Sequence, residues 1–92
     1  PISNLTSKYY FRLWVKDQPG VLASIADVFG VNSVSIASVL QKRVDLERES
    51  AELVITTHHA RESSVQKTID ELKCMSIVQH LSSFIRIEEY CD

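Results

Sequence analysis

The sequence predicts a small α+β domain whose elements follow the order β-α-β-β-α-β, and two observations support this prediction. Four segments alternate apolar and polar side chains with the two-residue period of a strand. Two other segments repeat apolar residues every three or four positions, as one face of a helix does. Elements in this order form a ferredoxin-like βαββαβ sandwich, in which two helices cover one face of a four-stranded antiparallel sheet. The 92 residues suffice for one such domain.

The first strand is expected at residues 8–16, which are rich in aromatic and β-branched side chains and alternate strictly. One face of this strand would carry Tyr9, Phe11, Leu13 and Val15. The other face would carry Tyr10, Arg12, Trp14 and Lys16. Residues 17–20 end the strand, and Pro19 suits the start of a helix because its missing N–H needs no partner there.

The first helix is expected to follow at once. Its apolar stripe has the spacing i, i+3, i+4 and i+7 and consists of Leu22, Ile25, Ala26 and Phe29, widened by Val21 and Val28. Gly30 and Asn32 stand where the helix must end, and either residue can adopt the left-handed conformation of a C-terminal cap.

Two further strands are expected on either side of a charged connection. Residues 34–40 are rich in Val and Ile and predict the second strand, and the alternation at residues 53–58 predicts the third. Residues 41–50 contain three basic and three acidic side chains. We therefore expect these residues to form a solvated hairpin connection.

The second helix and the last strand complete the pattern. Ser63 and Gln66 have the spacing of a capping box, so the helix is expected to begin there or up to three residues earlier. Its apolar stripe is narrow and consists of Val65, Ile69 and Leu72. The last strand is expected at residues 77–88, with an interruption near Ser82 and Ser83.

The composition excludes several classes of function. Ten basic and twelve acidic side chains give a net charge of −2, so the chain lacks the basic footprint with which nucleic-acid-binding proteins collect phosphates. No apolar run approaches the roughly 18–20 residues that span a bilayer. Cys74 and Cys91 match no metal or redox spacing, and we expect reduced thiols in a cytoplasmic protein. Because the sequence begins with Pro1 rather than Met, we expect a piece of a longer protein.

We expect no catalytic, cofactor or metal site in these residues. His58, His59 and His80 include no pair at helical spacing and no acidic ligand set, and the first two are expected to finish a strand with one side chain inside and one in solvent. The sequence has no Gly-rich phosphate loop. RNA binding on this topology would need exposed aromatic residues on both central strands, whereas only Tyr10 and Trp14 of the first strand qualify.

Residues 17–22 form the candidate site, because they join a strand to the start of a helix. A helix start presents unpaired backbone N–H groups and a positive dipole end, which suit a carboxylate. Gly20 lets a ligand approach the backbone closely, and Asp17 can accept hydrogen bonds from an ammonium group. Together these features favour a zwitterionic amino acid as the ligand. The alternative is that Pro19 and Gly20 only build a tight turn, while Asp17 helps to cap the helix.

The same junction carries a resemblance to a known family. Residues 9–22, Tyr-Tyr-Phe-Arg-Leu-Trp-Val-Lys-Asp-Gln-Pro-Gly-Val-Leu, resemble the opening of an ACT domain, and the Pro-Gly-Val-Leu junction is typical of that family. The resemblance continues through residues 25–26, 34–39, 41–42, 52–58 and 85–89. The doubled Tyr, the Thr-His strand end and the closing Ile-Arg-Ile-Glu resemble homoserine dehydrogenases in particular.

The resemblance implies a C-terminal regulatory domain of an NAD(P)-linked enzyme in threonine and methionine biosynthesis from aspartate. The NAD(P) and substrate sites would lie in preceding domains that this chain lacks. The resemblance also implies feedback control by a small amino-acid effector, threonine, bound at the interface of a homodimer that forms through edge strands. Residues 1–7 would be a linker, residues 8–90 the ACT-like domain and residues 91–92 a tail.

The resemblance places the effector contacts on two segments. The first loop would contribute Asp17, Gln18, Gly20, Val21 and Leu22, and the second strand of the partner copy would contribute Ser35 and Ile36. Many relatives carry Gly just before that strand, where Asn32 and Ser33 stand here, and we expect Asn32 to take the left-handed conformation. Ser35 stands where some effector-binding relatives carry Asn. Two alternatives stay open: a structural dimerisation module without a ligand, and an ACT domain of another parent, such as a stringent-response synthetase or a prephenate dehydratase.

Overall fold

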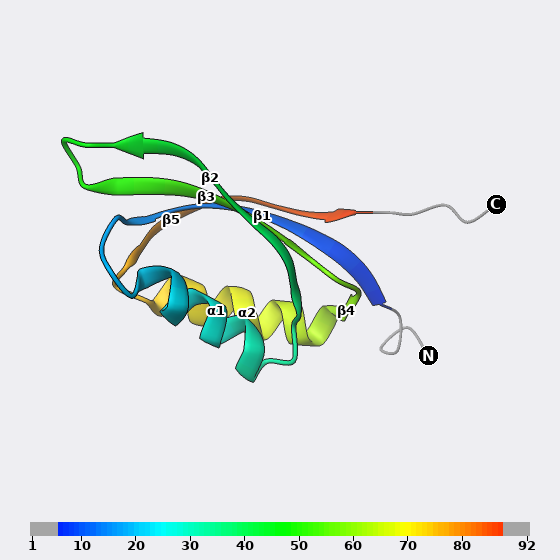
Figure 1. The fold of residues 1–92 in the computed structure, drawn as a ribbon. Helices are drawn as coiled ribbons and strands as arrows, with labels where there is room; N and C mark the ends of the chain where they lie inside the picture. The colour runs from blue at the N-terminus through cyan, green and yellow to red at the C-terminus, as the bar shows by residue number, and fades with distance from the viewer. Residues whose placement is uncertain (1–5, 88–92) are drawn as a thin grey trace.

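The chain forms two layers, a sheet and a pair of helices that cover one face of it, in a computed structural model that describes residues 6–87 (Figure 1). The elements are β1 (Thr6–Lys16), α1 (Val21–Val31), β2 (Ile36–Asp45), β3 (Ser50–Thr57), β4 (Ala60–Arg61), α2 (Glu62–Cys74) and β5 (Val78–Ile87). Strand β1 pairs with β3, β4 and β5, and β2 pairs with β3, all antiparallel. The predicted ferredoxin-like α+β fold is confirmed, and the two-residue strand β4 adds a fifth strand to the sheet. Within these residues, no helix has the length and apolar character to cross a membrane.

The core lies between the sheet and the helices. The alternation predicted for β1 is confirmed, because the side chains of its helix-facing residues are almost fully buried: Tyr9, Phe11, Leu13 and Val15. Leu53 and Ile55 of β3 lie beside them on the same face. Phe11 meets Phe29 of α1 edge to face, with ring centroids 5.2 Å apart, and Phe84 of β5 stacks on Tyr9 at 5.4 Å. Aromatic contacts therefore join the central strand to one helix and one edge strand.

The opposite face of the sheet is not covered by helices (Figure 1). Tyr10, Arg12 and Trp14 lie half-buried on this open face, so Trp14 is not a core residue. The Arg12 side chain donates a hydrogen bond to the Tyr10 hydroxyl at 2.9 Å, which raises the pKa of the guanidinium. Glu52 of β3 is only 5% exposed and lies between two arginines, with Nε of Arg12 at 3.9 Å and Nε of Arg43 at 3.8 Å. The negative charge of this buried carboxylate is therefore balanced by two arginines, and the three side chains come from β1, β2 and β3.

Helix α1 buries a different stripe from the one predicted. Ile25 and Phe29 are buried as expected, together with Val21, whereas Leu22 is 48% exposed and Ala26 is also exposed. Because Val21 is the first residue of the helix, its side chain already lies one turn below Ile25 and faces the sheet. The apolar stripe is therefore rotated by about one residue relative to the prediction.

The end of α1 also differs from the prediction. Ser33, with φ 62°, takes the left-handed conformation, while Asn32 has φ −96° and Gly30 lies inside the helix. The Asn32 side chain instead donates to the Val28 carbonyl at 2.9 Å and to Glu71 at 3.0 Å. The Asn32 side-chain amide thus connects the end of α1 to α2, and the left-handed residue is Ser33 instead.

Strands β2 and β3 form a longer hairpin than expected. Strand β2 begins at Ile36 rather than residue 34 and continues to Asp45, so most of the predicted solvated connection is paired strand. Only residues 46–49 form the turn, and Glu49 has φ 51° there. The charged side chains misled the prediction because β2 is an edge strand whose side chains are mostly exposed.

Helix α2 is stabilised differently from the predicted capping box. The helix starts at Glu62, Arg61 is its N-cap residue, and no side chain caps it, because Ser63 lies inside the first turn. The predicted stripe of Val65, Ile69 and Leu72 is confirmed. The prediction missed β4, whose two residues pair with Thr6 and Ser7 and so extend β1 two residues before its predicted start.

Strand β5 begins at Val78, one residue later than expected, and it is interrupted as expected near Ser82 and Ser83. The register with β1 shifts between the pairs Leu13–Leu81 and Arg12–Ser83. A second shift, between Val15–Val78 and Trp14–His80, places Gln79 as an extra residue. The predicted last residue of this strand, Glu88, lies outside the described residues. Cys74, at the end of α2, is a free exposed thiol, and Cys91 also lies outside the described range.

Candidate functional site

The loop between β1 and α1 is shaped by Gly20, which has φ +85° as the N-cap residue of α1. This left-handed conformation costs a residue with a side chain about 1–2 kcal/mol, so glycine is the natural choice. The Gly20 carbonyl accepts hydrogen bonds from the Ser24 backbone N–H at 3.0 Å and from its hydroxyl at 3.1 Å. The Gln18 carbonyl accepts from the Val21 N–H at 3.3 Å. The turn is therefore held by backbone groups and the Ser24 hydroxyl, and the side chains of Asp17 and Gln18 are exposed.

Asp17 does not cap the helix. Helix α1 has no side-chain cap hydrogen bond and no acidic residue in its first turn. Asp17 is instead anchored through its backbone, since its N–H donates to the Glu49 carbonyl in the β2–β3 turn at 2.7 Å. Within the turn, the Val21 N–H is bonded to the Gln18 carbonyl and the Ser24 N–H to the Gly20 carbonyl, while the exposed Asp17 carboxylate accepts no hydrogen bond from the helix start.

The predicted loop residues differ in what they can offer a ligand. Val21 is 6% exposed and packs in the core, so it can contribute only backbone atoms. Leu22 is 48% exposed beside the loop and can contribute an apolar side chain. Gly20 is open as well, since a Cβ placed on it would meet nothing within 4 Å.

Ser35 and Ile36 lie at the start of β2, at the other end of α1 (Figure 1). The Ser35 carbonyl accepts from the His58 N–H at 2.9 Å, and its side chain is exposed. Ile36 is half-buried and packs on the edge of the core. The eleven residues of α1, about 16 Å of helix, separate this segment from the β1–α1 loop. One copy of the chain therefore does not bring the two predicted halves of the site together.

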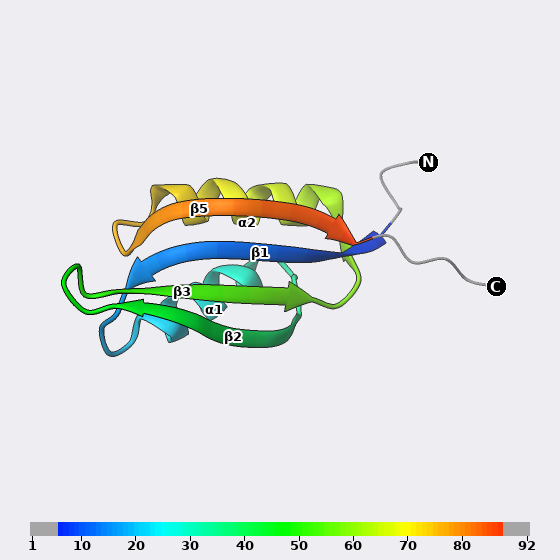
Figure 2. The same ribbon diagram turned by 90° about the horizontal axis from the view of Figure 1, so that it is seen from above.

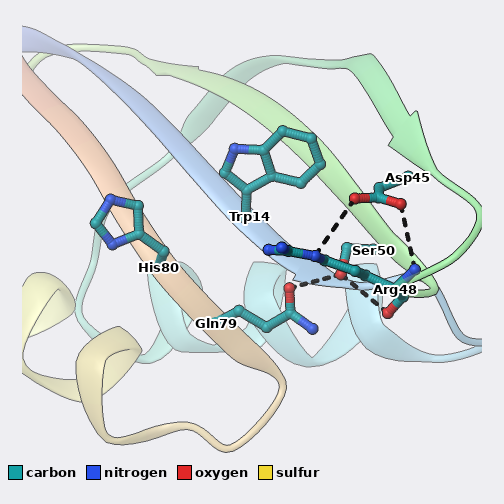
Figure 3. A pocket seen from close by; sticks show the side chains of 6 residues that line it. All are labelled: Trp14, Asp45, Arg48, Ser50, Gln79 and His80. Carbon is teal, nitrogen blue, oxygen red and sulfur yellow. Dashed lines mark hydrogen bonds and ion pairs between the residues drawn. The ribbon is translucent and has the colours of Figure 1, made fainter.

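The open face carries a pocket that the sequence analysis did not find (Figure 3). It has a volume of about 470 Å³ and is lined by Trp14, Asp45, Arg48, Ser50, Gln79 and His80. Two local features make it: the tight β2–β3 turn brings Arg48 close to the sheet, and the extra residue in β5 turns Gln79 toward the same region. Neither a four-residue turn inside a charged run nor a bulge leaves a clear sequence signal.

The three histidines do not come together in one site. His58 and His59 are both exposed, so the expectation that one would point inside is wrong. They follow β3 at a bend between β3 and β4, where neither side chain faces the core. Among residues 6–87 there is no group of three His, Cys, Asp or Glu side chains that could hold a metal ion.

Comparisons with known proteins place the fold and the β1–α1 loop in a family. Residues 9–73, which contain the loop and the start of β2, match the family model of the ACT domain. A homoserine dehydrogenase of Mycobacterium bovis is 38% identical over 91 residues, which are 96% of this chain and 21% of that protein. The chain therefore spans about one fifth of the length of this relative.

Solved structures agree with the sequence matches. The crystal structure of a homoserine dehydrogenase from Thiobacillus denitrificans superposes with a TM-score of 0.81 at 29% identity, over 97% of this chain and 19% of that one. The regulatory subunit of aspartate kinase from Thermus flavus shares the fold, with a TM-score of 0.53 at 14% identity, over 76% of this chain and 44% of that one. Since the family model covers more than half of the chain, this protein belongs to the ACT domain family, and it is similar to one segment of homoserine dehydrogenases.

Proposed function

We propose that this chain is the regulatory domain of a homoserine dehydrogenase and that it binds an amino-acid effector, threonine, between two copies. The observation that carries the proposal is the β1–α1 loop, where an uncapped helix start and the uncommitted Asp17 carboxylate lie together. The similarity to homoserine dehydrogenases over 96% of the chain supports the choice of parent enzyme. In that parent, the NAD(P) and substrate sites lie in other domains, and the enzyme works in the cytoplasm.

Each part of a bound threonine has a matching group in this proposal. The carboxylate lies at the N-terminus of α1, where unpaired amides and the helix dipole favour an anion. Asp17 and Gln18 hold the ammonium group, and the Leu22 side chain contacts the methyl group. The Ser35 hydroxyl and Ile36 of the second copy close the site over the effector.

The direction of β2 supports a site shared by two copies. Strand β2 runs from Ile36 to Asp45, and its far end joins the turn whose Glu49 carbonyl binds Asp17. If two copies join their β2 edges antiparallel, the start of β2 in one copy lies beside the loop end of the other. Val39 and Leu40 are 38% and 55% exposed on this edge, and an exposed apolar edge strand is a template for pairing. Pairing β2 therefore brings together the two segments that α1 separates.

The proposal is tested by calorimetric titration of the chain with L-threonine, with its mass measured by light scattering. We expect saturable binding by a dimer, and we expect Asp17→Asn to weaken binding at least tenfold while the dimer persists. Asp27→Asn is the matched control, because Asp27 is an exposed carboxylate on α1 outside the loop. Equal affinity in wild type and Asp17→Asn would contradict the role of Asp17. A stable dimer that gives no heat would instead support a structural dimerisation module.

A further inference from the structure

The pocket on the open face has walls of two kinds, an aromatic ring and a set of hydrogen-bond donors. Trp14 contributes the ring from the central strand β1. Arg48 comes from the β2–β3 turn, and Gln79 and His80 come from the edge strand β5 on the other side of β1. Figure 3 shows these side chains around a common space, with Trp14 above the Arg48 guanidinium in that view. A pocket of about 470 Å³ is within the usual range for small-molecule sites.

Two acceptor side chains of this pocket, Asp45 and Gln79, are already engaged by the protein. Asp45 accepts from the Arg48 backbone N–H through Oδ1 at 3.2 Å, and its Oδ2 lies 3.8 Å from Arg48 Nε. The Gln79 carbonyl oxygen accepts from the Ser50 hydroxyl at 2.6 Å. The same Ser50 hydroxyl also lies 3.2 Å from the Arg48 carbonyl, so Ser50 joins the β2–β3 turn to the Gln79 side chain.

The Arg48 guanidinium still has donors left for a ligand. Because Asp45 faces Nε, the far end of the Arg48 guanidinium extends away from Asp45 toward Trp14 (Figure 3). The Gln79 oxygen accepts from Ser50, and in Figure 3 the –NH2 group of this amide points away from the Arg48 guanidinium. The pocket therefore presents a planar cation beside an aromatic surface, and a guanidinium fork matches the two oxygens of a carboxylate.

We propose that this pocket binds a small organic carboxylate, with its carboxylate on Arg48 and its apolar body against the Trp14 ring. This site is separate from the proposed effector site. It lies on the open face of a single copy, it contains no residue of the β1–α1 loop, and it does not require the second copy. The two sites share only the β2–β3 turn, through the backbone contact of Asp17 with Glu49.

Trp14 makes the proposal directly measurable, because it is the only tryptophan of the chain. The experiment is a fluorescence titration with sodium benzoate at constant ionic strength, with benzamide as the uncharged analogue and N-acetyltryptophanamide as the control for collisional quenching. We expect benzoate to change the Trp14 emission saturably, and benzamide to produce no saturable change at the same concentrations. Arg48→Gln should weaken benzoate binding about tenfold or more, because it removes the charge and keeps a hydrogen-bonding side chain.

Control variants separate this site from surface charge and from the effector loop. Arg61→Gln removes an exposed arginine at the α2 end of the molecule, and we expect it to bind benzoate like wild type. Asp17→Asn should also leave benzoate binding unchanged, so a failure of the threonine proposal would not affect this result. Quenching that is linear in benzoate, or an Arg48→Gln variant with wild-type affinity, would overturn the proposal. Equal binding of benzamide would overturn it too, since the carboxylate would then play no part.

Discussion

The Thr57 hydroxyl satisfies a backbone group that the sheet leaves unpaired in the core. Its Oγ1 accepts a hydrogen bond from the Tyr9 N–H at 3.1 Å, and both residues are buried. Thr68 is equally buried, but its hydroxyl donates to the Ser64 carbonyl at 2.9 Å, one turn earlier in α2. The Ser64 carbonyl has a helical N–H partner as well. The two threonines are therefore equally buried, but only the Thr57 hydroxyl is the acceptor for a buried N–H group.

Thr57→Val should cost more stability than Thr68→Val. Valine keeps the shape of threonine, so the first variant mainly leaves the Tyr9 N–H buried without an acceptor, which costs about 1–3 kcal/mol. The second variant removes a donor whose acceptor stays bonded, and we expect a loss below about 1 kcal/mol. Urea unfolding of both variants measures the difference. Equal losses of unfolding free energy would show that the Thr57 hydrogen bond contributes no more to stability than the Thr68 hydrogen bond.

Tyr9 makes the free energy of unfolding of the domain depend on pH in the alkaline range. Burial raises the pKa of the Tyr9 phenol above its usual value of 10.0, the Glu62 carboxylate raises it further, and Arg86 opposes the change. The unfolded chain therefore loses this proton first as the pH rises. The stability that the folded chain gains from the protonated Tyr9 phenol is complete below pH 10 and is lost as the pH rises through the folded-state pKa.

The matched variant for this prediction is Tyr9→Phe, which has no proton to lose. Between pH 8 and pH 11, wild type should lose more free energy of unfolding than Tyr9→Phe, as measured by urea unfolding at each pH. Parallel pH profiles of the two proteins would mean that the phenol has the same pKa in the folded and unfolded chains.

At the scale of elements, β3 is buried on both faces over residues 50–55, although only Leu53 and Ile55 of this strand belong to the core cluster. The alternation in β1 was predictable because this strand buries one face against the helices. The boundaries of β2 were not, because an edge strand leaves most of its side chains in solvent and so carries no burial pattern. The buried face of α1 was predicted about one residue off, because Leu22 and Val21 are both apolar and only packing decides which of them faces the sheet. The loop of the candidate site was predictable from Asp17, Pro19 and Gly20. The open-face pocket was not predictable, because it is formed by a bulge in β5 and the β2–β3 turn, and neither feature leaves a clear sequence signal.

The two glycines at the ends of α1 should respond oppositely to the same substitution. Gly20 has φ +85° and open space where a Cβ would lie, so Gly20→Ala should cost about 1 kcal/mol through backbone strain alone. Gly30 lies inside the helix with equally open space, so Gly30→Ala should gain about 0.5–1 kcal/mol through helix propensity. Thermal unfolding of the two variants checks both signs. A stabilising Gly20→Ala would contradict the left-handed conformation of the loop.

At the scale of the whole molecule, two layers produce a thin domain with principal extents of 46 × 26 × 17 Å (Figure 1). Helices protect one face of the sheet, and the β2 and β5 edges lie along its long sides (Figure 2). Both edge strands contain bulges, and each keeps one regular stretch, at residues 38–41 of β2 and 83–87 of β5. We expect a second copy to pair at the β2 stretch, because pairing there brings the start of β2 in one copy beside the β1–α1 loop of the other.

Val39→Lys should therefore convert the proposed dimer to a monomer, because it places a charge at the centre of the paired edge. Ile85→Lys is the control, since Ile85 is 54% exposed on the opposite edge strand, β5. Light scattering should give half the wild-type mass for Val39→Lys and an unchanged mass for Ile85→Lys. The reverse result would move the interface to β5.

A shared effector site is tested by a series of ¹H–¹⁵N correlation spectra of the chain during titration with L-threonine. If two copies share the effector, the amide signals of Gly20, Val21 and Leu22 should shift together with those of Ser35 and Ile36, with one common dissociation constant. One copy keeps these segments about 16 Å apart, so joint shifts require the second copy. Shifts at only one end of α1, or no shifts from a folded dimer, would contradict the shared site.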